Sequence, residues 1–231
     1  MPNNLCIIPA RGGSKRIPKK NIKNFLGKPI IAYSIESAIQ SGLFNEVMVS
    51  TDDDEIAEVA KKYGANVPFM RSKDTSNDFA TTMEVIKEVV GDYEKLGCFF
   101  NDVCCIYATA PFVSVKHLQN SYGVFKEKSF DSLFPVMAFD FPIQRSLKLN
   151  DGKIQFNYPE YTQTRSQDLE KMYHDAGQFY WLKNLLIKSQ NTIMNANTGS
   201  YIISELEGQD IDNETDWKLA ELKYELLQSI K

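Results

Sequence analysis

The amino-acid sequence predicts an α/β fold with a doubly wound, mostly parallel sheet. Short apolar runs typical of buried strands alternate along the chain with segments whose apolar residues recur at helical spacing. The first of these strands leads directly into a loop that is rich in glycine and basic side chains. The composition, 43% hydrophobic and 24% charged in 231 residues, is that of an ordinary globular domain. We therefore expect one domain over residues 1–231, with parallel strands joined by right-handed crossovers.

The first half of the chain alternates between the two kinds of element. Each predicted strand is a short apolar run, and these strands are expected at residues 5–9, 46–50, 67–70 and 103–107. The predicted helices carry apolar residues at helical spacing and are expected at residues 30–41, 55–63 and 81–96. Gly64 ends the second of these helices. Ser114 can cap a fourth helix that runs through residue 126.

The alternation breaks after a strand at residues 132–138. Residues 139–173 contain two prolines, the turn Asn150-Asp151-Gly152 and aromatic residues without a helical period. This combination predicts an inserted hairpin or excursion. Exposed aromatic side chains in such an excursion suit a contact between two copies of the chain.

The remaining elements resume the sheet and end in a helix. Strands are expected at residues 178–182 and 200–203. Asn213 or Thr215 can cap the last helix. Leucines at positions 219, 222, 226 and 227 form an apolar stripe along it.

Charge and composition argue against several classes of function. The net charge is −4 and the basic residues gather in one loop, so a broad nucleic-acid-binding face is not expected. No apolar stretch approaches the length of a membrane span, and the start of the chain lacks the pattern of a secretion signal. We expect a cytoplasmic protein without nucleic-acid or membrane partners. The four cysteines lack metal-binding spacing, and three lie in strand-like runs, which favours buried, reduced thiols.

Residues 5–21, LCIIPARGGSKRIPKKN, combine the first strand with a candidate site for a polyphosphate. The loop carries five cations, at positions 11, 15, 16, 19 and 20. Gly12 and Gly13 let backbone N–H groups approach an anion closely, and the cations neutralise its charge. The spacing matches neither a Walker A loop nor a dinucleotide fingerprint. A basic surface loop that binds nothing is the alternative, but this loop follows a buried strand, where open α/β sheets place their ligands.

Asp210-Ile211-Asp212 is a candidate metal site. Alternate residues of an extended segment project to the same side, so both carboxylates can face one cation while Ile211 packs behind them. Magnesium takes one or two carboxylates together with water and substrate phosphate, which fits a position opposite the basic loop. The alternative is that these aspartates and Asn213 only cap the last helix. Spacing alone does not separate the two interpretations.

A second polar segment, residues 165–180, reads RSQDLEKMYHDAGQFY. Arg165, Gln167 and Gln178 are candidate polar contacts for a ligand. A solvated loop that enters a strand explains the same residues. A lone histidine such as His174 is more often structural than a catalytic base.

Several segments, taken in order, resemble the bacterial CMP-sialic-acid synthetases: IPARGGSKRIPKKN, VSTDDDEIAEVAKKYGA, ATAP, AGQFYW and DIDNETDW. These cytidylyltransferases transfer CMP from CTP to the anomeric hydroxyl of a nine-carbon ulosonic acid and release pyrophosphate. YATAPF and MYHDAGQFYW are most similar to the pseudaminic acid cytidylyltransferases, which serve flagellin or surface glycans. The resemblance implies a Rossmann-like nucleotidyltransferase fold with a small inserted dimerisation segment, a homodimer, and Mg²⁺ as cofactor.

The resemblance also implies roles for individual residues. The family's nucleotide-binding residues correspond to Ala10, Arg11, Gly13, Ser14, Lys15, Lys20, Asn21, Arg71, Asp78, Thr81 and Thr82. Arg11 and Lys20 would stabilise charge on the phosphates during catalysis. Asp210 and Asp212 would hold the metal. The candidate sugar contacts are Tyr107, Arg165, Gln167, His174 and Gln178.

The sequence departs from the sialic-acid synthetases where the sugar should bind. Tyr107 and Val113 stand where those enzymes carry a glutamine and an arginine. Only Gln144 and Arg145 correspond to their basic residue in the insertion. These departures argue against N-acetylneuraminate as the substrate, and the similarity of YATAPF and MYHDAGQFYW favours pseudaminic acid. Activation of N-acetylneuraminate or legionaminate is an alternative, and so is a catalytically silent nucleotide-binding regulatory subunit.

Overall fold

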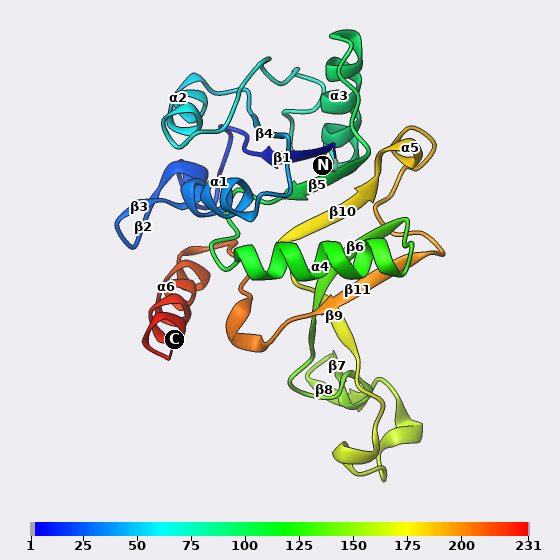
Figure 1. Ribbon diagram of the computed structural model, residues 1–231. Helices are drawn as coiled ribbons and strands as arrows, with labels where there is room; N and C mark the ends of the chain where they lie inside the picture. Colours follow the sequence, from blue (N-terminus) through cyan, green and yellow to red (C-terminus); the bar gives the residue numbers. More distant parts are fainter. Residues whose placement is uncertain (1–2, 231) are drawn as a thin grey trace.

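The computed structural model describes residues 3–230 and contains one large mixed sheet flanked by helices (Figure 1). The strands of this sheet are β1 (Asn4–Pro9), β4 (Glu46–Ser50), β5 (Asp102–Ile106), β6 (Ser132–Ala138), β9 (Tyr173–Asp175), β10 (Phe179–Lys183) and β11 (Thr198–Ile202). Their order is β11-β6-β10-β5-β1-β4, and β9 pairs with β6 off this path. A small second sheet joins β2 (Asn24–Phe25) to β3 (Lys28–Pro29).

Most strands of the large sheet run in one direction. β1 is parallel to β4 and β5, and β11 is parallel to β6. β10 lies antiparallel between β5 and β6, and β9 is antiparallel to β6. The mostly parallel sheet is therefore confirmed. Because β10 is reversed, its amino-terminal end lies at the edge where the parallel strands end, and the Tyr107 N–H donates to the Gln178 carbonyl there (2.8 Å).

Helices cover both faces of the sheet. α1 (Ile30–Ser41), α2 (Asp54–Lys62) and α4 (Val115–Glu127) pack on one face, against Cys6 and Ile8 of β1. α3 (Thr82–Lys95) and α5 (Asn184–Ile187) pack on the other, against Leu5 and Ile7. Successive side chains of β1 thus enter two different cores, as the alternation of a strand requires. The doubly wound arrangement is confirmed.

Polar side chains in the local sequence cap the starts of four helices. Asp53, Thr81, Ser114 and Asn213 each accept backbone N–H groups at the start of a helix. Of the two caps considered for α6 (Glu214–Ser229), Asn213 is the one used. The last helix therefore begins immediately after the Asp210-Ile211-Asp212 motif.

The leucine stripe of α6 is not its packed face. Leu219, Leu222 and Leu226 are exposed, whereas Leu227 packs against the body. The buried face carries Trp217 and Ala220, with Tyr224 beside them. Edge-to-face contacts of Trp217 and Tyr224 with Phe25 fix the rotation of the helix, at centroid distances of 5.5 and 5.7 Å.

Residues 67–70 do not form the predicted strand. Only Asn66 makes a bridge, to Met48 of β4. Pro68 has no N–H to continue a ladder, which explains why the pairing stops. The chain instead runs to Arg71, whose N–H donates to the Thr51 carbonyl (2.8 Å).

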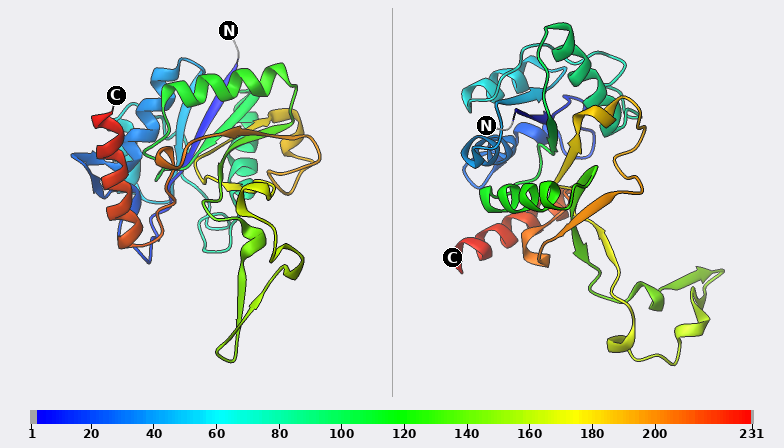
Figure 2. Two further views of the ribbon diagram at one scale, coloured as in Figure 1. Left: turned by 90° about the horizontal axis from the view of Figure 1, so that it is seen from below. Right: turned by 45° about the vertical axis from the view of Figure 1, so that its right-hand side comes forward.

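Residues 139–172, here called the excursion, leave the body of the molecule and return to it (Figures 1 and 2). The predicted hairpin is present as β7 (Leu147–Asn150) and β8 (Lys153–Phe156). Asp151 and Gly152 form its turn with φ of 46° and 75°. Most of its large apolar side chains are exposed, Phe141 by 84%. Short 3₁₀ helices complete the structure: η1 (Lys20–Ile22), η2 (Ile143–Arg145), η3 (Pro159–Tyr161), η4 (Ser166–Asp168) and η5 (Glu205–Glu207).

The four cysteines are free thiols, and Cys6, Cys104 and Cys105 are buried, as the sequence predicts, while Cys98 is exposed. Burial raises the pKa of Cys6 and Cys104, so both stay protonated. Over residues 3–230, no helix combines the length and the apolar character needed to cross a bilayer.

Candidate active site

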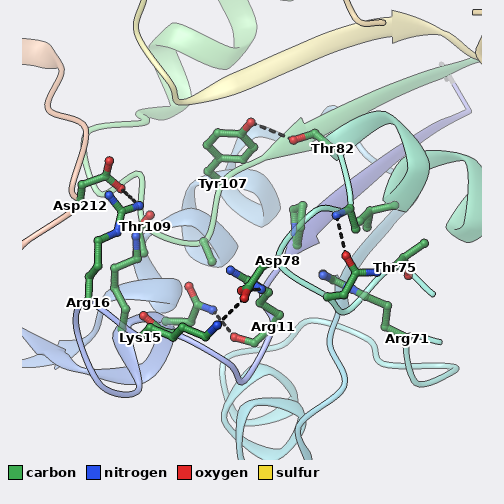
Figure 3. A pocket seen from close by; sticks show the side chains of 18 residues that line it. Arg11, Lys15, Arg16, Arg71, Thr75, Asp78, Thr82, Tyr107, Thr109 and Asp212 are labelled. Atoms are coloured by element: carbon green, nitrogen blue, oxygen red, sulfur yellow. Dashed lines mark hydrogen bonds and ion pairs between the residues drawn. The ribbon is translucent and has the colours of Figure 1, made fainter. Parts of the chain in front are cut away.

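A pocket of about 480 Å³, here called the first pocket, lies at the carboxyl ends of β1 and β5 (Figure 3). From β1 the chain continues to β4 on one side, and β5 lies on the other side. Such a topological switch is where open α/β sheets bind ligands. The polar lining includes Arg11, Lys15, Arg16, Lys20, Arg71, Asp78, Thr82, Tyr107, Thr109 and Asp212.

The loop after β1 is held in shape by its own hydrogen bonds. Ser14 Oγ donates to the Ile17 carbonyl (2.6 Å), and Asn21 Nδ2 donates to the Arg11 carbonyl (2.9 Å). Ile17 is fully buried and anchors the loop to the body. Position 12 requires glycine, because the Cβ of any other residue there would lie 2.6 Å from Asp53 Oδ2. The basic side chains therefore project from a defined backbone.

Three cations of this loop are paired with carboxylates across the first pocket. Arg11 Nη1 and Lys15 Nζ lie 2.6 and 2.5 Å from the two oxygens of Asp78, which Figure 3 shows between them. Hydrogen bonds from Lys15 and then Arg11 lower the pKa of Asp78. Arg16 Nη2 contacts Asp212 Oδ1 at 2.7 Å. A phosphate group can take the place of such a carboxylate, since both accept charge-assisted hydrogen bonds from the same cations.

Arg71 and Tyr107 form the deeper wall of the first pocket. Arg71 is 9% exposed, and its guanidinium donates to the hydroxyl and carbonyl oxygens of Ser50. Burial lowers its pKa, yet arginine stays charged in proteins. The hydroxyls of Tyr107 and Thr82 lie 2.9 Å apart. This wall thus combines one fixed cation with two hydroxyl groups.

The Asp210-Ile211-Asp212 motif has the alternation that its sequence predicts. Ile211 is 1% exposed and packs in the same cluster as Phe25 and Trp217. Lys20 Nζ donates to the Ile211 carbonyl (2.7 Å). Burial lowers the pKa of Lys20, and the charges of Asp212 and Asp210 oppose that change. Desolvation and then the charge of Asp212 raise the pKa of Asp210.

The motif offers oxygen ligands for a divalent cation. The cap of α6 is Asn213, supported by Asp216, so the capping function does not occupy the carboxylates of Asp210 and Asp212. Among residues 3–230 no group of three or more His, Cys, Asp or Glu side chains gathers in a way that could hold a metal. Asp212 faces the first pocket, and Asp210 lies two residues before it in the same segment. Mg²⁺ takes one or two carboxylates, because water and phosphate supply its other ligands. The residues present fit this ion.

A second pocket of about 660 Å³ lies on the other side of the motif. Asp212 lines the first pocket and Asp210 lines the second. One wall of the second pocket is apolar and includes Phe139. The ring centroids of Phe139 and His174 are 5.0 Å apart. Residues from β6, the excursion, β9, the segment before α6 and α6 itself line it: Met137, Phe139, Asp140, Phe141, His174, Asp175, Asp210, Leu219 and Lys223.

The structure brings most of the predicted site residues together. Arg11, Ser14, Lys15, Lys20, Asn21, Arg71, Asp78, Thr82 and Asp212 all line the first pocket. Tyr107, which we expected to contact the sugar, also lies there, beside Thr82. Of the other expected sugar contacts, His174 lines the second pocket.

Three expected nucleotide contacts have other positions. Ala10 is buried, and its N–H donates to the Ser50 carbonyl (2.9 Å). Thr81 caps α3 and accepts from the Glu84 N–H. Gly13 is next to Gly12, which lies close to Asp53, but Gly13 itself does not line the first pocket. These residues shape the loop and the helix that carry the lining side chains.

Three expected sugar contacts line neither pocket of this chain. Arg165 and Gln167 are exposed on the excursion, where Arg165 pairs with Asp168. Gln178 is 1% exposed and its amide donates to a backbone carbonyl. The sequence could not show this, because the positions of these residues depend on the path of the excursion and on the reversed strand β10.

Arg16 was one of the five cations that marked the loop as a polyphosphate site, although no individual role was assigned to it. Other lining residues were not predicted. Phe139 and Phe141 come from the start of the excursion, and Lys223 comes from α6. No local motif marks them, so only the fold reveals that they share a pocket.

The fold and the first pocket define a class of protein, an α/β protein with a cationic pocket at the carboxyl edge of its sheet and Asp212 in the pocket wall. A solved structure of CMP:2-keto-3-deoxy-manno-octonic acid synthetase, complexed with CTP, shares the fold with a TM-score of 0.70. It is 16% identical, and the match covers 98% of this chain and 99% of that chain.

Sequence comparisons place the chain within that class. Residues 5–197 match the model of the cytidylyltransferase family, and the chain belongs to this family. It is 42% identical to the pseudaminic acid cytidylyltransferase of Campylobacter jejuni over 224 residues, 96% of this chain and 97% of the relative. It is 32% identical to the CMP-N,N'-diacetyllegionaminic acid synthase of Legionella pneumophila over 97% of each chain. The resemblance seen in the sequence is confirmed.

Proposed function

We propose that this protein transfers CMP from CTP to the anomeric hydroxyl of pseudaminic acid and releases pyrophosphate. One observation carries the proposal. A cationic pocket and a second, partly apolar pocket meet at a carboxylate pair, in a chain 42% identical to a pseudaminic acid cytidylyltransferase over nearly its whole length.

The first pocket is the proposed site of CTP. The triphosphate carries about four negative charges near neutral pH, and bringing a second anion to it is opposed unless cations offset the repulsion. Arg11 and Lys15 would exchange Asp78 for phosphate oxygens, because the same donors serve both. Lys20 and Arg71 supply further positive charge from less exposed positions.

The second pocket is the proposed site of the ulosonic acid. The hydroxyl on C2 of the ulosonic acid would attack the α-phosphate of CTP in line, where Asp210 and Asp212 separate the two pockets. A new bond forms between this oxygen and the α-phosphorus, the bond to the β-phosphate oxygen breaks, and the hydroxyl proton passes to water. Positioning and charge stabilisation dominate such transfers.

Asp210 and Asp212 are the proposed ligands of Mg²⁺. When bound, this ion offsets phosphate charge and polarises the attacking hydroxyl. Lys20 lines the first pocket, and its bond to the Ile211 carbonyl holds it next to the motif. We propose that it contacts the transferred phosphate there.

The excursion is the proposed dimerisation and sugar-binding segment of a single cytidylyltransferase domain spanning residues 1–231. Phe141, Leu149 and Ile154 expose apolar surface that a second copy of the chain can cover. We also propose that the protein acts in the cytoplasm, because four free cysteines suit a reducing compartment.

The test is pyrophosphate release from CTP and Mg²⁺ with pseudaminic acid, N,N'-diacetyllegionaminic acid and N-acetylneuraminic acid offered separately. We expect release with pseudaminic acid, and its loss in Asp212→Ala. Release with only one of the other two acids would transfer the assignment to that acid. No release with any of them would favour a nucleotide-binding subunit without activity.

A further inference from the structure

The segment that carries the carboxylate pair has little regular structure of its own. Residues 204–212, here called the carboxylate segment, connect β11 to α6 and contain only the 3₁₀ turn η5. No strand ladder fixes the backbone at Asp210 or Asp212. Whatever sets the position of these carboxylates must therefore act through side chains.

Side-chain N–H groups from three other parts of the chain bind the carbonyl groups of this segment. Lys223 of α6 lies 3.2 Å from the carbonyls of Glu205 and Gly208. Lys20 donates to the Ile211 carbonyl. Gln178 Nε2 donates to the Glu207 carbonyl at 2.6 Å. The two lysines line the pockets, whereas Gln178 lies beneath them.

Gln178 links the carboxylate segment to the first pocket. Its own carbonyl accepts from the Tyr107 N–H (2.8 Å), and Tyr107 is part of the deeper wall. Its side chain is bonded to Glu207, three residues before Asp210. A single buried residue thus joins the wall of one pocket to the segment that separates the two.

Among the described residues, the side chain of Gln178 makes one hydrogen bond, to the Glu207 carbonyl. Its Oε1 is buried and has no hydrogen-bond partner among residues 3–230. Burying an unsatisfied acceptor costs about 1–3 kcal/mol, a cost that an apolar side chain of similar size would avoid. At Gly208 a Cβ would lie 2.5 Å from Met137 Sδ and 3.3 Å from Gln178 Nε2, so the segment is pressed closely onto this amide.

Glu207 is held from the other direction as well. Its carboxylate accepts from the backbone N–H and hydroxyl of Ser204, and Oε1 lies 3.0 Å from His117 Nε2 of α4. The Glu207 side chain and the Glu207 carbonyl are therefore both fixed, by α4 and by Gln178. This makes Glu207 a rigid point from which the backbone runs to Asp210.

We propose that Gln178 is a positioning residue that holds Asp210 and Asp212 in register with the nucleotide pocket. The inference rests on the proposed function, and it replaces the direct sugar contact expected from the sequence. Losing the bond would shift both carboxylates relative to the first pocket. Arg11, Lys15 and Arg71 would stay in place, because their partners are Asp78 and Ser50 and lie outside the carboxylate segment.

The test compares Gln178→Met with a matched control, Asn184→Leu. These two amides lie at opposite ends of β10. Asn184 Nδ2 donates to the Phe100 carbonyl (2.8 Å), and its Oδ1 is likewise buried without a partner. Both substitutions remove one amide-to-carbonyl bond beside the same strand, but only Gln178→Met affects the carboxylate segment.

Four quantities are measured for each protein: the melting temperature, the Kd for CTP without metal, the Kd for Mn²⁺ from the paramagnetic resonance signal of the free ion, and kcat. We expect Gln178→Met to weaken Mn²⁺ binding and to lower kcat by about ten- to a hundredfold, with the CTP Kd unchanged within about twofold. Asn184→Leu should lose similar thermal stability and keep both kcat and the Mn²⁺ Kd. Equal kcat and Mn²⁺ Kd in the two variants would overturn the proposal.

Gln178→Glu supplies a second readout that loss of packing does not explain. A protonated glutamic acid can donate its O–H to the Glu207 carbonyl, whereas a carboxylate cannot. We expect the kcat of this variant, relative to the unsubstituted protein, to rise as the pH falls. A ratio that does not depend on pH would contradict the positioning role. If the unsubstituted protein released no pyrophosphate with any ulosonic acid, the proposed function would fail, while the Mn²⁺ titrations would still decide the role of Gln178.

Discussion

The two pockets share the Asp210-Ile211-Asp212 motif but are built in opposite ways. The first pocket draws most of its cations from one continuous loop, and Arg11, Lys15 and Arg16 are already paired with carboxylates. The second pocket is assembled from short stretches of several separate segments and has an apolar wall that includes Phe139 and Phe141. We expect charge to dominate ligand binding in the first pocket, whereas the second pocket combines apolar contact with charged groups that include Asp175 and Lys223.

The largest expected effect tests the motif that the pockets share. Asp212→Ala should lower kcat/KM by about a hundredfold or more, because it removes a carboxylate placed to hold the cation that offsets phosphate charge. Binding of CTP without metal should not weaken, since Arg16 loses its partner Asp212 and becomes available to phosphate. Steady-state kinetics and calorimetry measure the two quantities. Asp92→Ala, on the surface of α3, is the control, and an equal loss in both variants would exclude a special role for Asp212.

A second substitution separates the pockets. Phe139→Ala should raise the KM for the ulosonic acid by about tenfold, the effect of losing apolar contact worth about 1.4 kcal/mol, and should leave the KM for CTP unchanged. Phe99→Ala removes another exposed ring at the far end of the sheet and should change neither value. Initial-rate kinetics with each substrate varied in turn provide the measurement. A rise in the KM for CTP alone would place the nucleotide, not the acid, against Phe139.

A smaller effect is expected from the carboxylate that occupies the first pocket. Asp78→Asn removes the charge that competes with phosphate for Arg11 and Lys15. The affinity for CTP should increase by roughly threefold, since these ion pairs are partly exposed and weak. Calorimetry without metal measures this change, and Asp74→Asn in the same loop is the control. Weaker binding would instead mean that Asp78 contacts the nucleotide directly.

The smallest expected effect is on stability. The pKa of Asp210 is raised in the folded protein by desolvation and by Asp212, so its ionised form opposes folding at pH values above that pKa. Asp210→Asn should therefore unfold at a slightly higher urea concentration than the unsubstituted protein near neutral pH. The difference should shrink as the pH falls through the folded pKa, because the unsubstituted protein then takes up the proton. A difference that grows on acidification would contradict this origin.

The sequence predicted the first pocket better than the second for a physical reason. A loop of contiguous cations keeps its chemistry whatever the exact path of the chain, and it lies next to the strand that positions it. Ser114 and Asn213 were likewise identified correctly, since a capping bond depends on residues two or three positions away. Local signals are sufficient where the interaction itself is local.

The differences between the expected and the observed positions have tertiary causes. Residues 67–70 looked like a strand, but Pro68 cannot extend the ladder that Asn66 begins. Gln178 was expected to reach a ligand, but it enters the structure ahead of a reversed strand and is buried beneath the carboxylate segment. Arg165 and Gln167 were expected beside it, yet the excursion carries them away from the body. Sequence spacing contains no information on these three outcomes.

The pairing at the base of the excursion has an evolutionary consequence. Ala138 of β6 lies directly opposite Tyr173 of β9, and the Phe139 N–H donates to the Met172 carbonyl (3.0 Å). The excursion therefore leaves and re-enters the sheet at one point, and the entropy of closing such a loop changes only slowly with its length. The residues between these pairs therefore form a segment that can be replaced without changing the sheet. Exchanging it between relatives should alter which sugar is accepted or how copies associate while the catalytic sheet is inherited unchanged.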